Sequence, residues 1–218
     1  MCKHDSPSKS CDTTEDVVIS LPTWAKEFYD AHKDHEFTTE EEMMKIAIAL
    51  ADKNVHEDTG GPFGTAIFEY DVETQKAKLF SVGMNQVVSL NNSSLHGEMT
   101  AIMFGQKKLA SYSFATNMHL GKEYHLYTSC EPCCQCLGGT LWSGVSKIVC
   151  AATKDDAEAI GFDEGPVFPA SYEALEQAGC KVVRNCLREE GAKTLQRYGL
   201  TGHIYNGSIR ESTRETEE

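Results

Sequence analysis

The apolar and polar positions of the chain fall into segments with either a helical or an extended period. A short helix is expected from about Trp24 to His35. Thr38 and Thr39 precede two glutamates at capping-box spacing, and the segment MMKIAIALADKN continues as a helix to about Asn54. GGPFG ends this helix, and the segments FGTAIFEY and KLFSVGMNQV then predict two strands that pair as a hairpin.

Helical and extended segments alternate through the rest of the chain. The expected helices are HGEMTAIMFGQKKLA, CCQCLGGTLWSG, SYEALEQAG and REEGAKTLQRYG, and the strands between them are YHLYTS, SKIVCAAT and KVVRN. The order β-β-α-β-α-β-α-β-α predicts a single α/β domain around a mostly buried mixed sheet. We place this domain at residues 21–206, between a polar, disordered extension over 1–20 and a polar acidic tail over 207–218.

The charge of the chain limits the partners that it can bind. The formal net charge is −13 at pH 7. Binding to a nucleic-acid backbone needs lysine and arginine side chains that displace counterions from the phosphates. We therefore expect no nucleic-acid partner, and we interpret the acidic surface as a solvated one that favours solubility.

The cysteines indicate metal binding. Four of the nine cysteines lie within seven residues, at positions 130, 133, 134 and 136. Such crowding in a chain of this size favours a metal site over a disulfide scaffold. The first residues contain no apolar core of a secretory signal, and no apolar run approaches the roughly 18 residues of a membrane span. We therefore expect a cytoplasmic protein with no membrane partner.

Two short motifs hold the candidate metal ligands. His96 opens one predicted helix, and Pro132, Cys133 and Cys136 open another, so both motifs lie where α/β sheets usually bind ligands. Pro132 is expected at the first helical position, which puts both cysteines inside the helix and on one face. One imidazole and two thiolates suit zinc, and three protein ligands leave a fourth position for water, as in catalytic sites.

The cysteine cluster permits other arrangements. Cys130 and Cys133 form a second C-x-x-C pair, and Cys130 could supply a fourth ligand in a purely structural zinc module. Cys134 is rotated by about 100° from the ligand face, and a small buried hydrophobe is the favoured interpretation of it. The same interpretation applies to Cys150 and Cys180, which lie in apolar strands.

Glu98 is the candidate that would give the metal site a hydrolytic activity. It is two positions from His96, too close for a comfortable second ligand but able to reach a water on the metal. Zinc lowers the pKa of such a water towards about 7, and a neighbouring carboxylate can move its proton. A first-turn glutamate can also simply complement the helix dipole. The catalytic role is favoured because H-x-E followed by P-C-x-x-C is the pattern of zinc deaminases.

From about Thr39 to Asn206 the chain resembles the cytidine-deaminase superfamily, and within it the bacterial guanine deaminases, including members that also accept ammeline. The resemblance rests on GGPFG, the asparagine of GMNQV, HGE, TSCEPCCQC and DDAEAIGFDEGP at 155–166. The last motif is the most specific, since generic cytidine and tRNA deaminases lack it. The resemblance implies a three-layer α/β/α sandwich around a mixed five-stranded sheet, and zinc-dependent hydrolysis of guanine to xanthine and ammonia.

The resemblance also implies roles for four further residues. Asn85 is expected to hydrogen-bond the purine ring and Phe63 to wall the pocket; a turn asparagine and a core phenylalanine are the alternatives. Glu164 is expected to be a second proton shuttle, although an acid in a Gly-Pro turn is otherwise an ordinary solvated residue. Similar enzymes close the pocket with a C-terminal aromatic residue, often from the partner subunit of a homodimer with segment exchange. Tyr205 is the candidate here, ahead of His203.

The chain departs from the family pattern without losing a ligand. Gly97 stands where relatives usually have alanine, and Cys134 and Gln135 stand where they have methionine or proline. Related small substrates (guanosine, ammeline or another aminopurine) remain alternatives to guanine. An enzyme that edits RNA or single-stranded DNA needs a basic channel, which the charge disfavours. A structural zinc module leaves Glu98 and the motif at 155–166 unexplained, and residues 1–38 receive no function.

Overall fold

The computed structural model describes residues 17–206. In this range the helices are α1 (Thr23–His32), α2 (Glu40–His56), α3 (Gly97–Leu109), α4 (Cys134–Ser143), α5 (Lys154–Glu158), α6 (Pro169–Gln177) and α7 (Arg188–Thr201), with the 3₁₀ helix η1 (Phe114–Leu120). The strands are β1 (Gly64–Asp71), β2 (Lys76–Met84), β3 (Lys122–Cys130), β4 (Lys147–Ala152) and β5 (Lys181–Val183). Every predicted strand and helix is present. The predicted extension over 1–20, apart from residues 17–20, and the tail over 207–218 lie outside the described residues, and the domain boundaries stay predictions.

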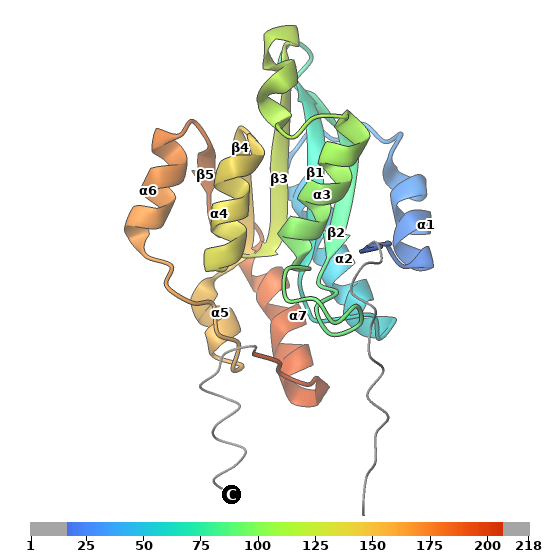
Figure 1. The fold of residues 1–218 in the computed structure, drawn as a ribbon, viewed down its shortest axis with the longest axis vertical. Coiled ribbons are helices and arrows are strands. Elements are labelled where there is room, and N and C mark those ends of the chain that lie inside the picture. Colours follow the sequence, from blue (N-terminus) through green and yellow to red (C-terminus); the bar gives the residue numbers. More distant parts are fainter. Residues whose placement is uncertain (1–16, 207–218) are drawn as a thin grey trace, which may run out of the picture.

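The five strands form one mixed sheet with the order β2-β1-β3-β4-β5. β1 runs antiparallel to β2 and β3, whereas β3, β4 and β5 are parallel. This topology brings the start of β1 and the ends of β2, β3 and β4 to one edge, the lower edge in Figure 1. Ligands of α/β proteins usually bind at the carboxyl ends of parallel strands, so this lower edge is where a site is expected.

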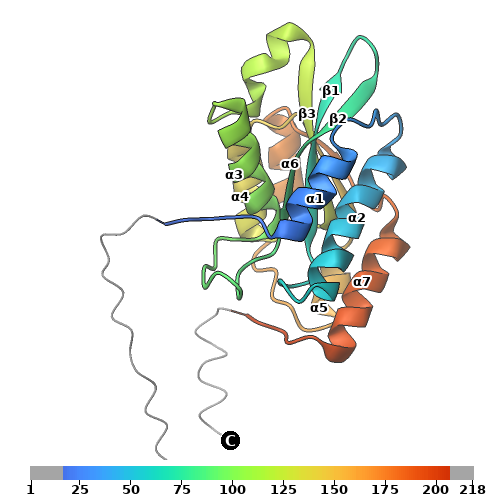
Figure 2. The same cartoon turned by 90° about the vertical axis from the view of Figure 1, so that its right-hand side faces the viewer.

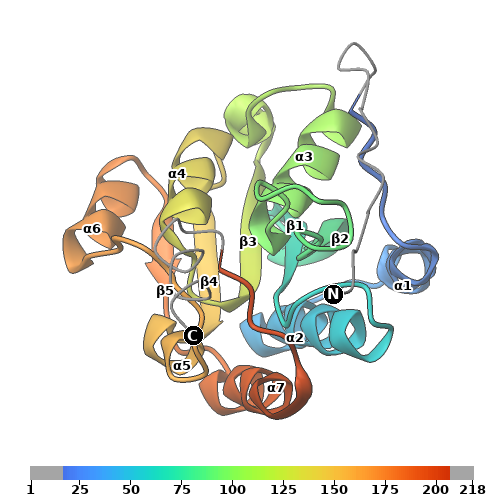
Figure 3. The ribbon, with the colours of Figure 1, turned by 60° about the horizontal axis from the view of Figure 1, so that its bottom comes forward.

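Helices cover both faces of the sheet, which confirms the three-layer sandwich (Figures 2 and 3). Successive side chains of a strand point to opposite faces. Ile67 of β1 and Leu126 of β3 therefore join the core beneath α3, α4 and α6, while their neighbours Phe68 and Tyr127 join the core beneath α1, α2 and α7. All four side chains are fully buried. The burial of both faces explains why the strands are almost continuously apolar.

The start of α2 has the capping box that its sequence predicts. The Thr39 hydroxyl accepts a hydrogen bond from the Glu42 N–H at 3.2 Å, and the Glu42 carboxylate accepts one from the Thr39 N–H at 3.2 Å. Close packing of α2 on the sheet depends on Gly64, where a Cβ would lie only 2.3 Å from the backbone nitrogen of Ala51. The helix therefore sits directly above the start of β1.

Two short helices, η1 and α5, are not predicted by the apolar pattern, because each is too short to show a period. A signal for α5 does exist in the sequence, since Thr153 and Asp156 have capping-box spacing with aspartate in place of glutamate. The observed ends of two further elements differ from the predicted ones. Helix α1 stops at His32 rather than about His35, and the last strand contracts to Lys181–Val183.

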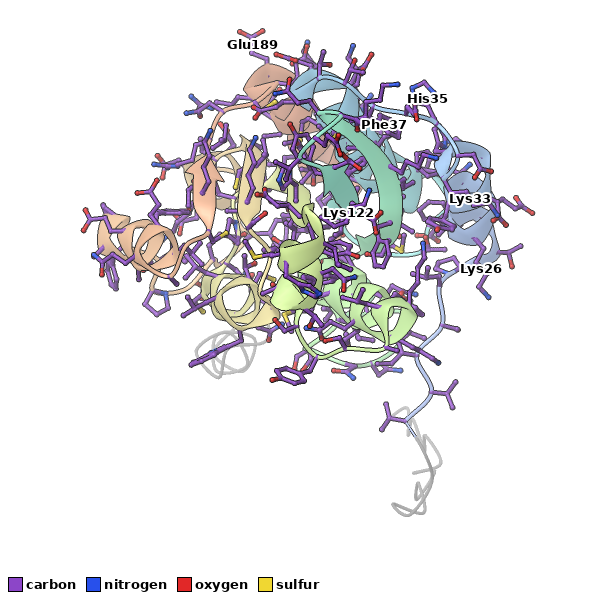
Figure 4. All side chains as sticks on the ribbon, turned by 90° about the horizontal axis from the view of Figure 1, so that it is seen from above. Lys26, Lys33, His35, Phe37, Lys122 and Glu189 are labelled. Atoms are coloured by element: carbon purple, nitrogen blue, oxygen red, sulfur yellow. The ribbon has the colours of Figure 1, made fainter. Side chains whose placement is uncertain are left out.

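The segment before α2 covers the β2 side of the sheet. Trp24 of α1 is buried, and its Nε1 donates a hydrogen bond to the Thr59 hydroxyl at 3.0 Å. Phe37 forms an isolated β-bridge with Ala77 of β2, with both N–H···O distances at 2.9 Å. Its ring packs edge-on against Phe68 with centroids 5.0 Å apart. Figure 4 marks Phe37 beside the sheet, with His35 further out.

The described residues agree with two expectations from composition. No helix within 17–206 has the length and apolar character needed to cross a membrane. The seven cysteines of this range are all free, so none takes part in a disulfide scaffold. Cys150 and Cys180 are buried, as predicted.

Candidate active site

The predicted metal ligands come together at the lower edge of the sheet. The ligand atoms of His96, Cys133 and Cys136 all lie within 4.8 Å of one another, and His96 Nδ1 is 3.3 Å from Cys133 Sγ. Within residues 17–206 no other group of three His, Cys, Asp or Glu side chains converges in this way. Zinc bonds of about 2.0 Å to nitrogen and about 2.3 Å to sulfur separate tetrahedral ligands by about 3.5 Å, so this donor set fits a zinc ion.

The start of α4 differs from its predicted form. Helix α4 begins at Cys134, so the prediction that Pro132 is its first residue and that Cys133 lies inside it is wrong. Cys133 is instead the N-cap, with an extended backbone (φ −65°, ψ 173°), just as His96 is the N-cap of α3. The two cysteines still face one another, because an N-cap residue and the third residue of a helix lie close together. Both helix N-termini favour a thiolate at this position.

The other two cysteines of the cluster stay outside the metal group. Cys130 Sγ lies 3.4 Å from the Thr153 carbonyl oxygen and donates a hydrogen bond to it. Burial raises the pKa of the Cys130 thiol well above its ordinary value. No fourth cysteine joins the group within residues 17–206, which disfavours a structural zinc module. Cys134 is exposed, so the expectation that it is a buried hydrophobe is wrong: the helix turns it towards the surface loop at Gly165.

Hydrogen bonds within the ligand set favour the thiolate form of Cys133. Its pKa is lowered to about 4, mainly because its sulfur accepts a hydrogen bond from Cys136 and also from His96. The pKa of Cys136 is raised because its thiol is the donor in that pair. Burial lowers the pKa of His96, but the hydrogen bond and charge of Cys133 outweigh burial and raise it. Metal binding releases such shared protons, since zinc ligands must be deprotonated.

Glu98 lies beside the ligands in the first turn of α3. Its side chain is buried, and its Oε1 accepts a hydrogen bond from the Thr128 hydroxyl at 3.2 Å. Burial, and then the negative charge of Cys133, raise the pKa of the Glu98 carboxyl. A first-turn glutamate that only complemented the helix dipole would be exposed. The burial of Glu98 at the metal ligands instead suits a group that exchanges a proton.

Glu164 lies at the same cavity as Glu98 and the metal ligands, but it comes from a different part of the chain. Its loop follows α5, and its backbone oxygen accepts a hydrogen bond from the N–H of Cys134 at 3.1 Å. Only 6 % of Glu164 is exposed, so it is not a solvated turn residue. Burial is the main cause that raises its pKa to about 8, and the negative charges of Cys133 and Glu98 add to it. Two buried carboxyl groups thus flank one set of metal ligands.

All eight residues proposed from the sequence line a single cavity of about 390 Å³, namely Phe63, Asn85, His96, Glu98, Cys133, Cys136, Glu164 and Tyr205. The cavity opens at the lower edge of the sheet, which Figure 3 brings forward. The segment that follows α7 crosses this edge and brings Tyr205 to the cavity of its own chain. Cavities of this size hold small molecules.

Asn85 and the aromatic residues line the same cavity as the metal ligands. Asn85 is 2 % exposed, and its Oδ1 accepts a hydrogen bond from the Val87 N–H at 3.2 Å. Phe63 and Tyr205 both pack edge-on against Phe162, with ring centroids 4.9 and 5.4 Å apart. The Tyr205 hydroxyl is buried and lies beside the Asn85 side chain. Both residues line the cavity.

Residues that the sequence pattern does not single out support this part of the cavity. Asn54, at 0 % exposure, donates from Nδ2 to the backbone oxygens of Gly61 (2.8 Å) and Asn85 (2.9 Å). Its Oδ1 accepts a hydrogen bond from the Thr59 hydroxyl, which is the group that Trp24 also contacts. An asparagine on the apolar face of a helix just before two glycines is the signal that could have identified Asn54. Phe162 carries no such signal, because a phenylalanine in a loop is usually an ordinary packing residue.

Comparison with known proteins places the chain in a family. The profile of the cytidine and deoxycytidylate deaminase zinc-binding region matches residues 37–152. The chain is 34% identical over 128 residues to the guanine deaminase of Bacillus subtilis, covering 59% of this chain and 74% of that protein. A solved guanine deaminase from Nitrosomonas europaea superposes with a TM-score of 0.75 at 33% identity, covering 85% of this chain and 97% of the other.

A more distant relative has a different kind of substrate in its name. The tRNA-specific adenosine deaminase of Buchnera aphidicola is 25% identical over 155 residues, covering 71% of this chain and 90% of that protein. The chain therefore belongs to the cytidine and deoxycytidylate deaminase family, and it is a zinc-dependent aminohydrolase related to guanine deaminases.

Proposed function

We propose that this enzyme hydrolyses guanine to xanthine and ammonia. The observation that carries the proposal is the convergence of two buried carboxyl groups, Glu98 and Glu164, on the cavity that holds His96, Cys133 and Cys136. Glu164 belongs to the motif at 155–166 that resembles guanine deaminases. The similarity to two proteins named guanine deaminase supports the same substrate.

The walls of the cavity suit a flat heterocycle with polar edges. Phe63 and Phe162 offer aromatic surface to the ring faces. The Asn85 amide and the Tyr205 hydroxyl offer hydrogen-bonding groups that can reach ring nitrogens and the carbonyl oxygen. We assign substrate binding to Asn85, Phe63 and Tyr205, because all three line the cavity that holds the metal ligands.

Glu98 and Glu164 each carry out a different proton transfer of the reaction. Zinc held by His96, Cys133 and Cys136 would act as a Lewis acid and lower the pKa of a water molecule. Glu98 takes a proton from the attacking water as its oxygen bonds to the amine-bearing carbon, and passes this proton to the adjacent ring nitrogen. Glu164, a buried carboxyl group with a raised pKa, donates a proton to the departing amine as the carbon–nitrogen bond breaks, and regains one from the hydroxyl that becomes the carbonyl. One water is consumed, and the amine leaves as ammonia.

The alternative of a nucleic-acid substrate receives less support. None of the described residues that line the cavity is lysine or arginine, and the chain carries a net charge of −13. Binding of RNA or single-stranded DNA depends on neutralising phosphates. The tRNA deaminase relative is also less similar, at 25% identity. Guanosine, ammeline and other aminopurines remain the alternatives that share this chemistry.

Ammonia release from a panel of amines tests the proposal. We expect the zinc-loaded enzyme to turn over guanine faster than guanosine, adenine, cytosine, cytidine or ammeline. Glu98→Ala should keep zinc but lose at least about 100-fold in kcat, as is typical when a general acid–base is removed. Turnover of another member of the panel with guanine inert would overturn the substrate. Full activity of Glu98→Ala would overturn the mechanism.

Assembly and location belong to the same proposal. We propose a homodimer, as in similar enzymes, and sedimentation equilibrium measures it directly. In this structure Tyr205 lies in the cavity of its own chain, and exchange of the C-terminal segment between subunits stays a prediction. A cytoplasmic location suits the cysteine ligands, which must stay reduced to bind metal.

A further inference from the structure

The loop that carries Glu164 has no regular secondary structure of its own. Gly161 (φ 106°) and Gly165 (φ 68°) both adopt left-handed conformations that residues with a side chain rarely take. Its start is held by backbone hydrogen bonds from Gly161 to Glu158 and from Phe162 to Ala157, and two further hydrogen bonds hold its end. The N–H of Cys134 donates to the Glu164 oxygen at 3.1 Å, and Lys154 Nζ donates to the Gly165 oxygen at 3.2 Å.

The outer side of the loop is held by the segment that follows α7. Asn206 Nδ2 donates a hydrogen bond to the Gly161 oxygen at 2.9 Å, and Asn206 Oδ1 accepts one from the Asp163 N–H at 2.9 Å. One amide therefore bonds two backbone groups on either side of Phe162. The preceding Tyr205 packs its ring against Phe162, so the contact combines a polar and an aromatic part. Figure 3 shows this segment crossing the lower edge of the sheet.

We propose that Asn206 is a positioning residue that fixes the 161–165 loop and thereby holds Glu164 in the cavity. The Asp163 N–H that Asn206 bonds is directly before Glu164 in the chain. Without this bond the loop can move outwards, and the buried Glu164 carboxyl gains hydration by leaving the cavity. A catalytic group displaced by about 1 Å can cost about 100-fold in rate. This inference rests on the proposed function, which gives Glu164 its role.

The side chain of Asn206 suits this task because it is both donor and acceptor. Asn206→Ala removes both hydrogen bonds. Asn206→Asp keeps the acceptor for the Asp163 N–H but loses the donor to Gly161 and places a negative charge beside that carbonyl oxygen. We expect kcat for guanine to fall about 10-fold to 100-fold in Asn206→Ala and less in Asn206→Asp. KM should rise by less than kcat falls, because Phe162 of the same loop only lines the cavity whereas Glu164 acts in the chemical step.

A double-mutant cycle separates positioning from general damage. Glu164→Gln removes the carboxyl group through which Asn206 is proposed to act. Adding Asn206→Ala to Glu164→Gln should therefore reduce the residual turnover no further. An equal loss in both backgrounds, or unchanged kcat in Asn206→Ala alone, would overturn the proposal. Zinc content and thermal midpoint are measured for each variant, and Thr201→Ala, an exposed position at the end of α7, is the control.

Amide hydrogen exchange tests the same contact without any catalysis. Asn206→Ala should speed exchange in the 161–165 loop by at least 10-fold, and Asn206→Asp should do so less at Asp163. Unchanged exchange in Asn206→Ala would show that the loop does not depend on Asn206. If Glu164→Gln is itself fully active, the role of Glu164 in the proposed function is wrong, while the exchange experiment still decides whether Asn206 holds the loop.

Discussion

Gly61 makes room for the residue that closes the cavity. A Cβ on Gly61 would lie 2.1 Å from the Tyr205 hydroxyl oxygen, far inside van der Waals contact. The atom in the way is the end of a side chain, so Gly61→Ala should move Tyr205 rather than unfold the protein. We expect KM for guanine to rise about 10-fold, the value of one lost hydrogen bond of about 1.4 kcal/mol.

The control for this substitution is Gly138→Ala, where nothing lies within 4 Å of the new methyl group. Alanine also suits a helix better than glycine, so Gly138→Ala should leave KM unchanged and stability unchanged or higher. Steady-state kinetics of both variants check the prediction. An unchanged KM in Gly61→Ala would show that the position of Tyr205 does not matter for binding.

At the residue scale, what is predictable from sequence depends on how strongly chemistry restricts the residue. His96, Cys133 and Cys136 are predictable because few residue types bind zinc and their spacing is narrow. Asn85 and Glu164 need the family resemblance, since asparagine and glutamate occur in many loops. Asn206 is not predictable at all, because its partners are backbone groups of Asp163 and Gly161, which are 43 and 45 residues away in the chain.

At the element scale, the carboxylate of Asp156 links helix α5 to helix α7. Asp156 accepts hydrogen bonds from the Thr153 N–H and hydroxyl at 2.8 Å and two from the Arg188 guanidinium at 3.0 Å. The hydrogen bond with Arg188 is the main cause that lowers its pKa to about 2. Because α5 leads into the loop of Glu164, this carboxylate also anchors one end of the active site.

The lowered pKa of Asp156 predicts a pH-dependent part of the stability. The unfolded carboxyl group titrates near 3.8 and the folded one near 2, so the stabilisation is complete above about pH 4 and is lost as the pH falls towards 2. Asp156→Asn should lower the free energy of unfolding by roughly 0.5–1 kcal/mol at pH 7, since Arg188 is half exposed. The difference from the unmodified protein should vanish near pH 2.

Denaturant unfolding between pH 2 and 7 measures this dependence, with the exposed neighbour in Asp155→Asn as the control. A constant difference across the pH range would show that the ion pair does not set the pKa of Asp156.

The long helices and strands are predictable from the periodicity of their apolar residues, whereas α5 and η1 are not. Such short helices are fixed by a few side-chain caps and by the contacts of neighbouring elements rather than by a repeating pattern.

At the scale of the whole molecule, the metal site joins two helices but lies apart from the main cores. His96 and Cys133 cap α3 and α4, and none of the three ligands belongs to the two large cores on the faces of the sheet. Chelation of zinc should therefore lower the thermal midpoint while far-UV circular dichroism at 25 °C stays native. A bound metal adds about 2.7 kcal/mol at 100 times its dissociation constant.

The midpoint should rise with zinc concentration in the unmodified enzyme and not in Cys136→Ser, which lacks one ligand. Calorimetry at several zinc concentrations checks this prediction. Loss of the native circular dichroism on chelation would instead show that the metal is needed for folding.

The sandwich itself is predictable from the order of strands and helices. The closure of the cavity is not, because residues 161–165 and 204–206 meet only in the folded chain.

The β-bridge between Phe37 and Ala77 has a consequence for aggregation. β2 is an edge strand, and an uncovered edge offers N–H and C=O groups to the strands of other molecules. Phe37 occupies such groups at Ala77, and α1 packs beside the same strand. The segment from α1 to Phe37 thus covers part of the β2 edge, which leaves fewer of its backbone groups open to edge-to-edge association with another molecule.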